Sequence, residues 1–291
     1  MLGARARQPI RNLETRRRLD EARRQSPESE PWLGLLEAAL SESENAAVWE
    51  DAVPEPVADR PASAPLLFRT LVGVDGPRTR RWVRRLARLA QLEMEQSDPL
   101  ALLEVAIRQQ NAPTDAPALR VLAQMAAFPF LQACGRVLER RVPGAWWEGY
   151  CPVCGGWPIL AELRGLDRKR WLRCGRCATA WEIPALRCPF CDETHHERLG
   201  YFAPEGDGQT RKVEVCHTCK GYVKALTTVR AVPSWAVLLD DLSTVPLDLV
   251  ALERGYHRPE RPGHDLAVRL TERSRTPRAL ARALSLWRKA P

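Results

Sequence analysis

The pattern of apolar and polar positions divides the chain into a helical first half and a strand-rich second half. Over 82–94, apolar residues recur at spacings of three and four, which is the stripe of an amphipathic helix. The stretch 118–141 is strongly apolar and is interrupted by Pro129. Further helices are predicted at 11–25, 32–40 and 100–109, with a proline-rich loop at 52–65. Residues 1–148 are therefore expected to form a helical domain.

Cysteine spacing changes the picture for the second half. Eight of the nine cysteines form four Cys-x-x-Cys pairs. The pairs are Cys151 with Cys154, Cys174 with Cys177, Cys188 with Cys191, and Cys216 with Cys219. A turn with two residues between its cysteines aims both sulfurs at one ion, and two such turns complete a tetrahedral site. The spacing therefore predicts two four-cysteine metal sites, with these eight cysteines as ligands.

The four cysteine pairs could share two ions in two ways. Consecutive pairs give two ribbons in tandem, whereas interleaved pairs give a cross-braced module. Short runs of bulky residues predict strands at 157–163, 169–173, 180–183, 213–215 and 222–226. Because these strands flank the pairs, they favour the tandem arrangement, in which a metal closes each small sheet.

The chemistry of such sites is limited by their ligands. Tetrahedral thiolate sites suit iron and zinc equally. Four thiolates leave no open position at which the ion could activate water. The sequence also has no Ser-His-Asp pattern, phosphate-binding glycine loop or dinucleotide fingerprint. We therefore predict no catalytic residues and no further cofactor, and interpret the chain as a binding or maturation protein and not an enzyme.

Charge and hydropathy suggest which partners to expect. The formal charge of +8 and the pI of 9.2 would invite nucleic-acid binding. Eight thiolates with two divalent ions would lower that charge to about +4, which weakens this interpretation. No apolar run approaches the ~20 residues of a membrane span, and the arginine-rich start lacks the apolar core of an export signal. A soluble, cytoplasmic protein is expected.

The residues around the cysteine pairs form a longer pattern over 149–260. It contains Tyr150-Cys151-Pro152-Val153-Cys154-Gly155, Arg170-Trp171-Leu172-Arg173-Cys174 with Cys177 and Trp181, Arg187-Cys188 with Cys191, and Glu214-Val215-Cys216 with Cys219. It continues through Gly221-Tyr222-Val223-Lys224, Asp240-Asp241-Leu242, Asp248 and Gly255-Tyr256. With this pattern the chain resembles the formate dehydrogenase accessory protein (FdhE) family.

The resemblance implies a fold and a function. It implies a cytoplasmic maturation factor or chaperone that formate dehydrogenase needs for activity and that acts on the immature catalytic subunit. It also implies an α+β architecture with a helical N-terminal domain and two tandem rubredoxin-like or zinc-ribbon modules that hold iron. The expected parts are 1–148 (helical), 149–187 (first four-cysteine module), 188–262 (second four-cysteine module) and 263–291 (basic helical tail, with Leu266 and Leu270 among its apolar positions).

Other functions remain open from the sequence. A zinc-ribbon nucleic-acid binder would also use paired cysteines. A thiol or sulfur-transfer protein would need a reactive cysteine outside the metal sites. The unpaired Cys134 is expected to be buried in an apolar helix. The acidic residues Asp240, Asp241 and Asp248 could contact a partner, but helix capping or exposure at the surface is the preferred interpretation.

Overall fold

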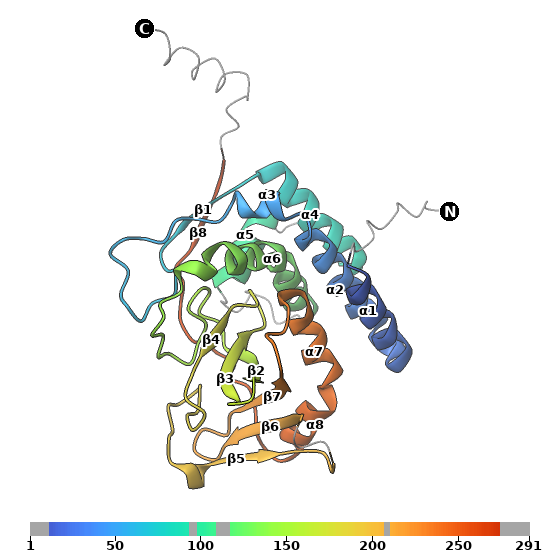
Figure 1. Ribbon diagram of the computed structural model, residues 1–291. Helices are drawn as coiled ribbons and strands as arrows, with labels where there is room; N and C mark the ends of the chain where they lie inside the picture. Colours follow the sequence, from blue (N-terminus) through green and yellow to red (C-terminus); the bar gives the residue numbers. More distant parts are fainter. Residues whose placement is uncertain (1–11, 93–97, 109–116, 207–209, 274–291) are drawn as a thin grey trace.

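The computed structural model describes residues 12–92, 98–108, 117–206 and 210–273 and has an α+β fold (Figure 1). Helices of the first half gather at one end, and a sheet built from the second half lies against them. Two later helices, α7 and α8, run along one side of the sheet. The predicted fold class is confirmed.

The helical half contains the five predicted helices, although the one predicted over 82–94 begins at Gly76 and ends at Leu89, and the short helix Ala46–Glu50 was not predicted. Its helices are α1 (Leu13–Gln25), α2 (Glu30–Ser43), α3 (Ala46–Glu50), α4 (Gly76–Leu89), α5 (Pro99–Arg108) and α6 (Pro117–Leu138), with short 3-10 turns at Pro27–Ser29 and Glu139–Arg141. Local capping explains several starts. The Asn12 side chain accepts hydrogen bonds from the N–H groups of Glu14 and Thr15, and Asp98 accepts one from Leu100.

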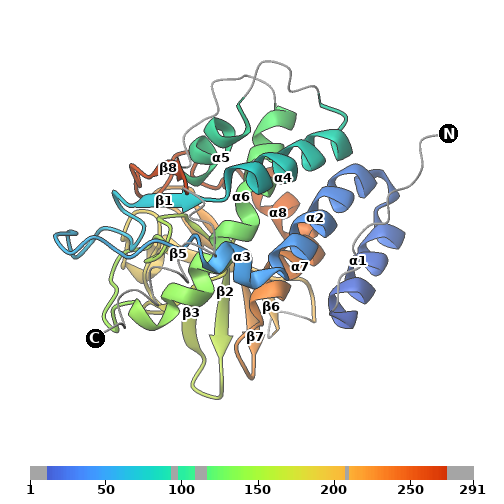
Figure 2. The ribbon, with the colours of Figure 1, turned by 90° about the horizontal axis from the view of Figure 1, so that it is seen from above.

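Helix α6 is the centre of this half, and the other helices surround it in the view from above (Figure 2). Contrary to the expectation from sequence that no stretch approaches a membrane span, it is the one helix in the described part of the chain that is long and apolar enough to cross a membrane. However, 78% of its most apolar window is buried inside the protein. The indole N–H of Trp82 on α4 donates to the Ala126 carbonyl of α6. Helix α6 is therefore a helix of the protein core.

The sheet has six strands in the order β4-β3-β2-β7-β6-β5. They are β2 (Pro158–Arg164), β3 (Lys169–Cys174), β4 (Ala180–Glu182), β5 (Leu199–Phe202), β6 (Arg211–Cys216) and β7 (Tyr222–Thr228). Each half of the sheet is an antiparallel unit of three strands. Parallel pairing of β2 with β7, from Leu160 opposite Lys224 to Arg164 opposite Thr228, joins the units. The two expected small sheets are thus one continuous sheet.

The remaining elements lie outside this sheet. Helices α7 (Val237–Ser243) and α8 (Val245–Glu253) follow a short 3-10 turn at Ser234–Ala236, and another such turn lies at His196–Arg198. Strand β8 (Arg269–Glu272) pairs in parallel with β1 (Leu71–Val74) of the helical half.

The helix predicted for the basic tail is wrong over its first part. Leu266 is fully buried in non-helical chain, and Leu270 lies in β8. Here the apolar residues fill the core beside β1, and backbone pairing with β1 replaces helical hydrogen bonds. The rest of the predicted tail, 274–291, lies outside the described residues.

One hydrophobic core joins the two halves of the chain. It contains the helical residues Leu86, Ile107 and Phe130 together with Leu172 of β3. It also contains the first four motif cysteines. The proposed boundary near residue 148 therefore crosses a shared core, and the helices directly support the first group of four cysteines.

Candidate metal centres

The eight motif cysteines lie in two quartets of consecutive pairs. Cys151, Cys154, Cys174 and Cys177 form the first quartet, and Cys188, Cys191, Cys216 and Cys219 form the second. Within each quartet all four sulfurs lie within 4.8 Å of one another. None of the nine cysteines, all of which are described, forms a disulfide. The structure thus has the tandem arrangement that the strands favoured.

The four Cys-x-x-Cys turns share one backbone geometry. The residue directly after each second cysteine has a positive φ: Gly155 (66°), Ala178 (59°), Asp192 (61°) and Lys220 (57°). This left-handed residue turns the chain back toward the sulfurs. Backbone N–H groups also point at the sulfurs, as from Val153 to Cys151 at 3.4 Å and from Gly221 to Cys219 at 3.3 Å. Such N–H groups offset the charge of a thiolate.

The sulfur spacing fits tetrahedral coordination. A metal–sulfur bond of about 2.3 Å places tetrahedral sulfurs about 3.8 Å apart. The sulfurs of Cys188 and Cys219 lie 3.7 Å apart, as do those of Cys191 and Cys216. In the first quartet the two corresponding separations are both 3.4 Å. Each quartet could therefore hold a metal ion.

The electrostatics of the first quartet also favour a cation. Burial raises the pKa of the Cys151 thiol well above its ordinary value. Hydrogen bonds from the other three sulfurs lower the pKa of Cys154 well below its ordinary value. Burial therefore opposes ionisation of Cys151, whereas the neighbouring sulfurs favour ionisation of Cys154. A bound cation would supply the charge that allows all four to ionise.

Helix α6 supports the first quartet from the helical half. A Cβ on Gly135 would lie 2.0 Å from the carbonyl oxygen of Cys177, so only glycine permits this approach. Three residues earlier, the Gln132 amide donates to the Arg176 carbonyl in the same turn at 3.2 Å. The first-quartet cysteines are at most 2% exposed. This centre is enclosed by protein on all sides.

The second quartet lies nearer the surface. Cys191 is exposed and Cys219 is partly exposed, whereas Cys188 and Cys216 are buried. The Glu193 carboxylate ties the two turns together by accepting from the Thr218 hydroxyl at 2.7 Å. This bond and the N–H of His195 lower the pKa of Glu193 to about 2. The second centre is thus stabilised by polar contacts of Glu193 between its two turns, and not by the core shared with the helices.

Aromatic side chains connect the two quartets. The Tyr150 ring, directly before the first turn, lies 6.0 Å from that of Trp157. Trp157 in turn lies 5.4 Å from Phe190, which is inside the first turn of the second quartet. A Cβ on Gly149 would lie 1.7 Å from the Pro189 carbonyl oxygen, so the backbones of these turns are in close contact. The two quartets are therefore neighbours in space.

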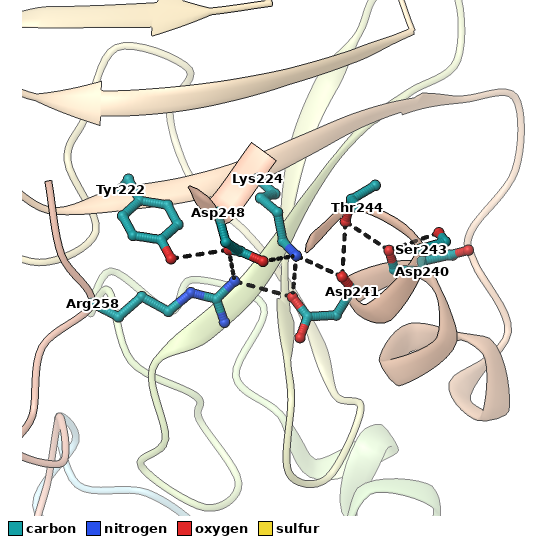
Figure 3. Close-up of polar contacts among 8 residues, drawn as sticks. All are labelled: Tyr222, Lys224, Asp240, Asp241, Ser243, Thr244, Asp248 and Arg258. Carbon is teal, nitrogen blue, oxygen red and sulfur yellow. Dashed lines mark hydrogen bonds and ion pairs between the residues drawn. The ribbon is translucent and has the colours of Figure 1, made fainter. Parts of the chain in front are cut away.

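A buried ion cluster holds α7 and α8 against the sheet (Figure 3). Lys224 of β7 is fully buried, and its ammonium lies 2.8 Å from an Asp241 oxygen and 2.6 Å from an Asp248 oxygen. Arg258 contacts the same two carboxylates at 3.0 and 2.9 Å. The Tyr222 hydroxyl donates to Asp248 at 3.0 Å.

This cluster changes the interpretation of the acidic residues. Asp241 and Asp248 compensate buried charge and are not free surface groups. Asp240 forms an ion pair with Arg18 of α1, which fastens α7 to the helical half. Sequence reasoning did not identify Lys224 as the partner, because the contact depends on how β7 meets α7 and α8.

In the described part of the chain neither the histidines nor Cys134 belong to the two quartets, although His217 lies inside the turn between Cys216 and Cys219. His195, His196 and His217 are exposed, and His217 Nδ1 lies 2.8 Å from the Tyr256 hydroxyl. Cys134 is fully buried on α6, and burial raises the pKa of its thiol well above the ordinary value. The thiol therefore lacks the exposure and ionisation of a reactive cysteine.

Comparisons with known proteins agree with this architecture. A family model described as FdhE, C-terminal domain, matches residues 186–262. A protein FdhE homolog of Stutzerimonas stutzeri is 37% identical over 123 residues, which cover 40% of this chain and 39% of that protein. A homolog of Rhizobium meliloti is 32% identical over 177 residues (58% and 56%). Protein FdhE of Escherichia coli is 27% identical over 210 residues (62% and 64%). The matches thus span less than two thirds of these relatives' own lengths.

A solved structure extends the likeness to most of the fold. The crystal structure of the FdhE protein from Pseudomonas aeruginosa aligns with a TM-score of 0.57, over 87% of this chain and 96% of that chain. The sequence identity is 22%, so this match supports the fold. All three comparisons point to the same family as the cysteine pattern.

Proposed function

We propose, from the FdhE family that the three comparisons support, that this chain is a cytoplasmic accessory factor in the maturation of formate dehydrogenase and is not itself an enzyme. The relatives carry the name FdhE, and the chain is similar to them in sequence and to one solved FdhE structure in fold. The observation that carries the proposal is the pair of sulfur quartets, each of which would saturate a bound ion and leave no position for substrate.

Both quartets hold a metal ion in this proposal. Cys151, Cys154, Cys174 and Cys177 bind one ion, and Cys188, Cys191, Cys216 and Cys219 bind the other. Iron is the proposed metal, with zinc as the alternative occupant. Iron held by four thiolates supplies a one-electron centre, whereas zinc supplies only structural support. In either case the ions stabilise the turns on which the six-stranded sheet depends.

The protein partner is the immature catalytic subunit of formate dehydrogenase, contacted through the metal modules. The buried arginines of the first module support a protein partner over nucleic acid. Arg173 lies 3.3 Å from the buried Glu162, and Arg170 lies 2.8 Å from Glu214. These guanidinium groups are occupied inside the sheet and are not presented to phosphates. A sulfur-transfer protein would need a reactive cysteine outside the metal sites. Cys134 is the one candidate, and its burial argues against that function.

Co-purification with the catalytic subunit tests the proposal. The metal-loaded chain is expected to retain the subunit on an affinity column, while Cys151→Ser and Cys216→Ser variants lose it along with one ion each. Retention of the subunit by both variants would count against docking through the metal modules. No retention by the unmodified chain would contradict the proposed function itself.

A further inference from the structure

A cleft of about 450 Å³ lies between the two halves of the molecule. One wall is formed by α6, which contributes Arg120 and Phe128. The opposite wall comes from the metal modules, through Trp157 and Arg176, and from the loop 258–262. Its volume is in the range of about 300–1,000 Å³ typical of binding sites. We call it the α6 cleft.

The α6 cleft has an apolar base. Phe128 and Met125 of α6 are buried there, and Trp157 and Phe190 line it from the two modules. Since Trp157 lies in the first metal module and Phe190 in the second, an occupant would contact the helical half and both modules together. Aromatic side chains of this kind anchor partner side chains at protein interfaces.

Positive charge at the α6 cleft is only partly compensated. Arg258 is neutralised by Asp241 and Asp248. Arg120 and Arg261, by contrast, are exposed and form no ion pair within the described residues. Glu260 is the one carboxylate of the described lining that is not already in the buried ion cluster. The cleft therefore presents an excess of guanidinium groups.

Arg176 provides a donor that lacks an acceptor. Its Nη2 group is held by the carbonyl oxygens of Ala106 and Ile107 on α5. Its Nη1 atom is buried and has no hydrogen-bond partner within the described structure. Arg176 is therefore a guanidinium fixed by α5 in the lining of the cleft, and its charge favours an anionic occupant.

We propose that the α6 cleft binds an acidic segment of the protein partner that also carries an apolar side chain. Carboxylates of the segment face the exposed guanidinium groups of Arg120 and Arg261, and the enclosed Arg176 adds positive charge beneath them. The apolar side chain packs on Phe128 and Trp157. This inference rests on the proposed function, because it assigns the place at which the catalytic subunit docks.

Charge reversal at the rim of the α6 cleft tests the inference. The affinity of the full-length chain for the catalytic subunit is measured by isothermal titration calorimetry. The double variant Arg120→Glu with Arg261→Glu is expected to bind about tenfold more weakly or worse. The control is Arg81→Glu, an exposed arginine on α4 outside the cleft, which is expected to bind within about twofold of the unmodified chain.

The outcomes separate this inference from the proposed function. If the double variant binds as tightly as the unmodified chain, the cleft assignment is overturned and the proposed function stands. If the unmodified chain does not bind the subunit, the proposed function fails and the cleft assignment fails with it.

A competition experiment identifies the class of occupant. A synthetic acidic peptide containing leucine and phenylalanine is expected to displace the subunit at about tenfold lower concentration than a peptide of glutamate alone. Equal displacement by the glutamate peptide, by inorganic phosphate or by duplex DNA would show a simple anion site and would overturn the proposal.

Discussion

Replacement of Gly135 by alanine probes the contact between the helical half and the first quartet. The added Cβ would lie 2.0 Å from the Cys177 carbonyl oxygen, whereas real Cβ contacts essentially never fall below 3.0 Å. Helix α6 or the cysteine turn must therefore move by about 1 Å. Overpacking of this kind costs about 1–3 kcal/mol, against which alanine regains about 1 kcal/mol of helix propensity. The expected net loss of unfolding free energy is up to about 2 kcal/mol.

The same displacement should weaken metal binding at the first quartet. Metal–ligand distances tolerate changes of only about 0.2 Å, and loss of outer support typically costs about 10–100-fold in affinity. Chelator competition followed by elemental analysis measures the affinity, and urea unfolding measures the stability. We expect Gly135→Ala to lose the first-quartet ion about 10–100-fold more readily than the unmodified chain.

Gly34→Ala provides the matched control for this substitution. Gly34 lies within α2, and its added Cβ would meet nothing within 4 Å. The control should gain up to about 1 kcal/mol of stability and retain both ions. If Gly135→Ala instead matches Gly34→Ala in stability and metal retention, α6 does not support the first quartet.

Burial and charge lead to three more expected outcomes. A chelator should remove the second-quartet ion first, because Cys191 is exposed while the first-quartet cysteines are at most 2% exposed; simultaneous loss of both ions would contradict this. Lys224→Met should lower the unfolding free energy in urea by about 3 kcal/mol, because it leaves the partly buried Asp241 and Asp248 with only Arg258 as a cation. The exposed control Lys169→Met should change it by less than about 0.5 kcal/mol, and equal effects would refute the role of the cluster. Iodoacetamide should modify Cys134 only after unfolding, and alkylated Cys134 in the mass spectrum of native protein would contradict its burial.

The quartets could be predicted from sequence because their geometry is local. Two cysteines separated by two residues determine one turn, and the strands between the pairs bring two turns together. The helices of the first half were predictable for the same reason, since spacing and caps act within a few residues. Asp98, for example, caps α5 through Leu100, only two residues away.

The joining of the modules depends on contacts that are distant in sequence. The parallel pairing of β2 with β7 matches Leu160 to Lys224, and no local pattern encodes that register. Strand β8 is a second case, since Leu270 satisfies a helical spacing but pairs with Val72 of β1. The burial of Lys224 is a third, because its carboxylate partners come from two later helices. In each case tertiary packing determines the outcome.

Elemental analysis of anaerobically purified protein would decide whether the two quartets are metal centres. We expect two ions per chain, one in each quartet, with the absorption bands of ferric thiolate if iron is the occupant. Cys151→Ser should leave a single ion, held by the second quartet. Purified protein with no bound metal, or with disulfides within the four pairs, would contradict the assignment of both centres.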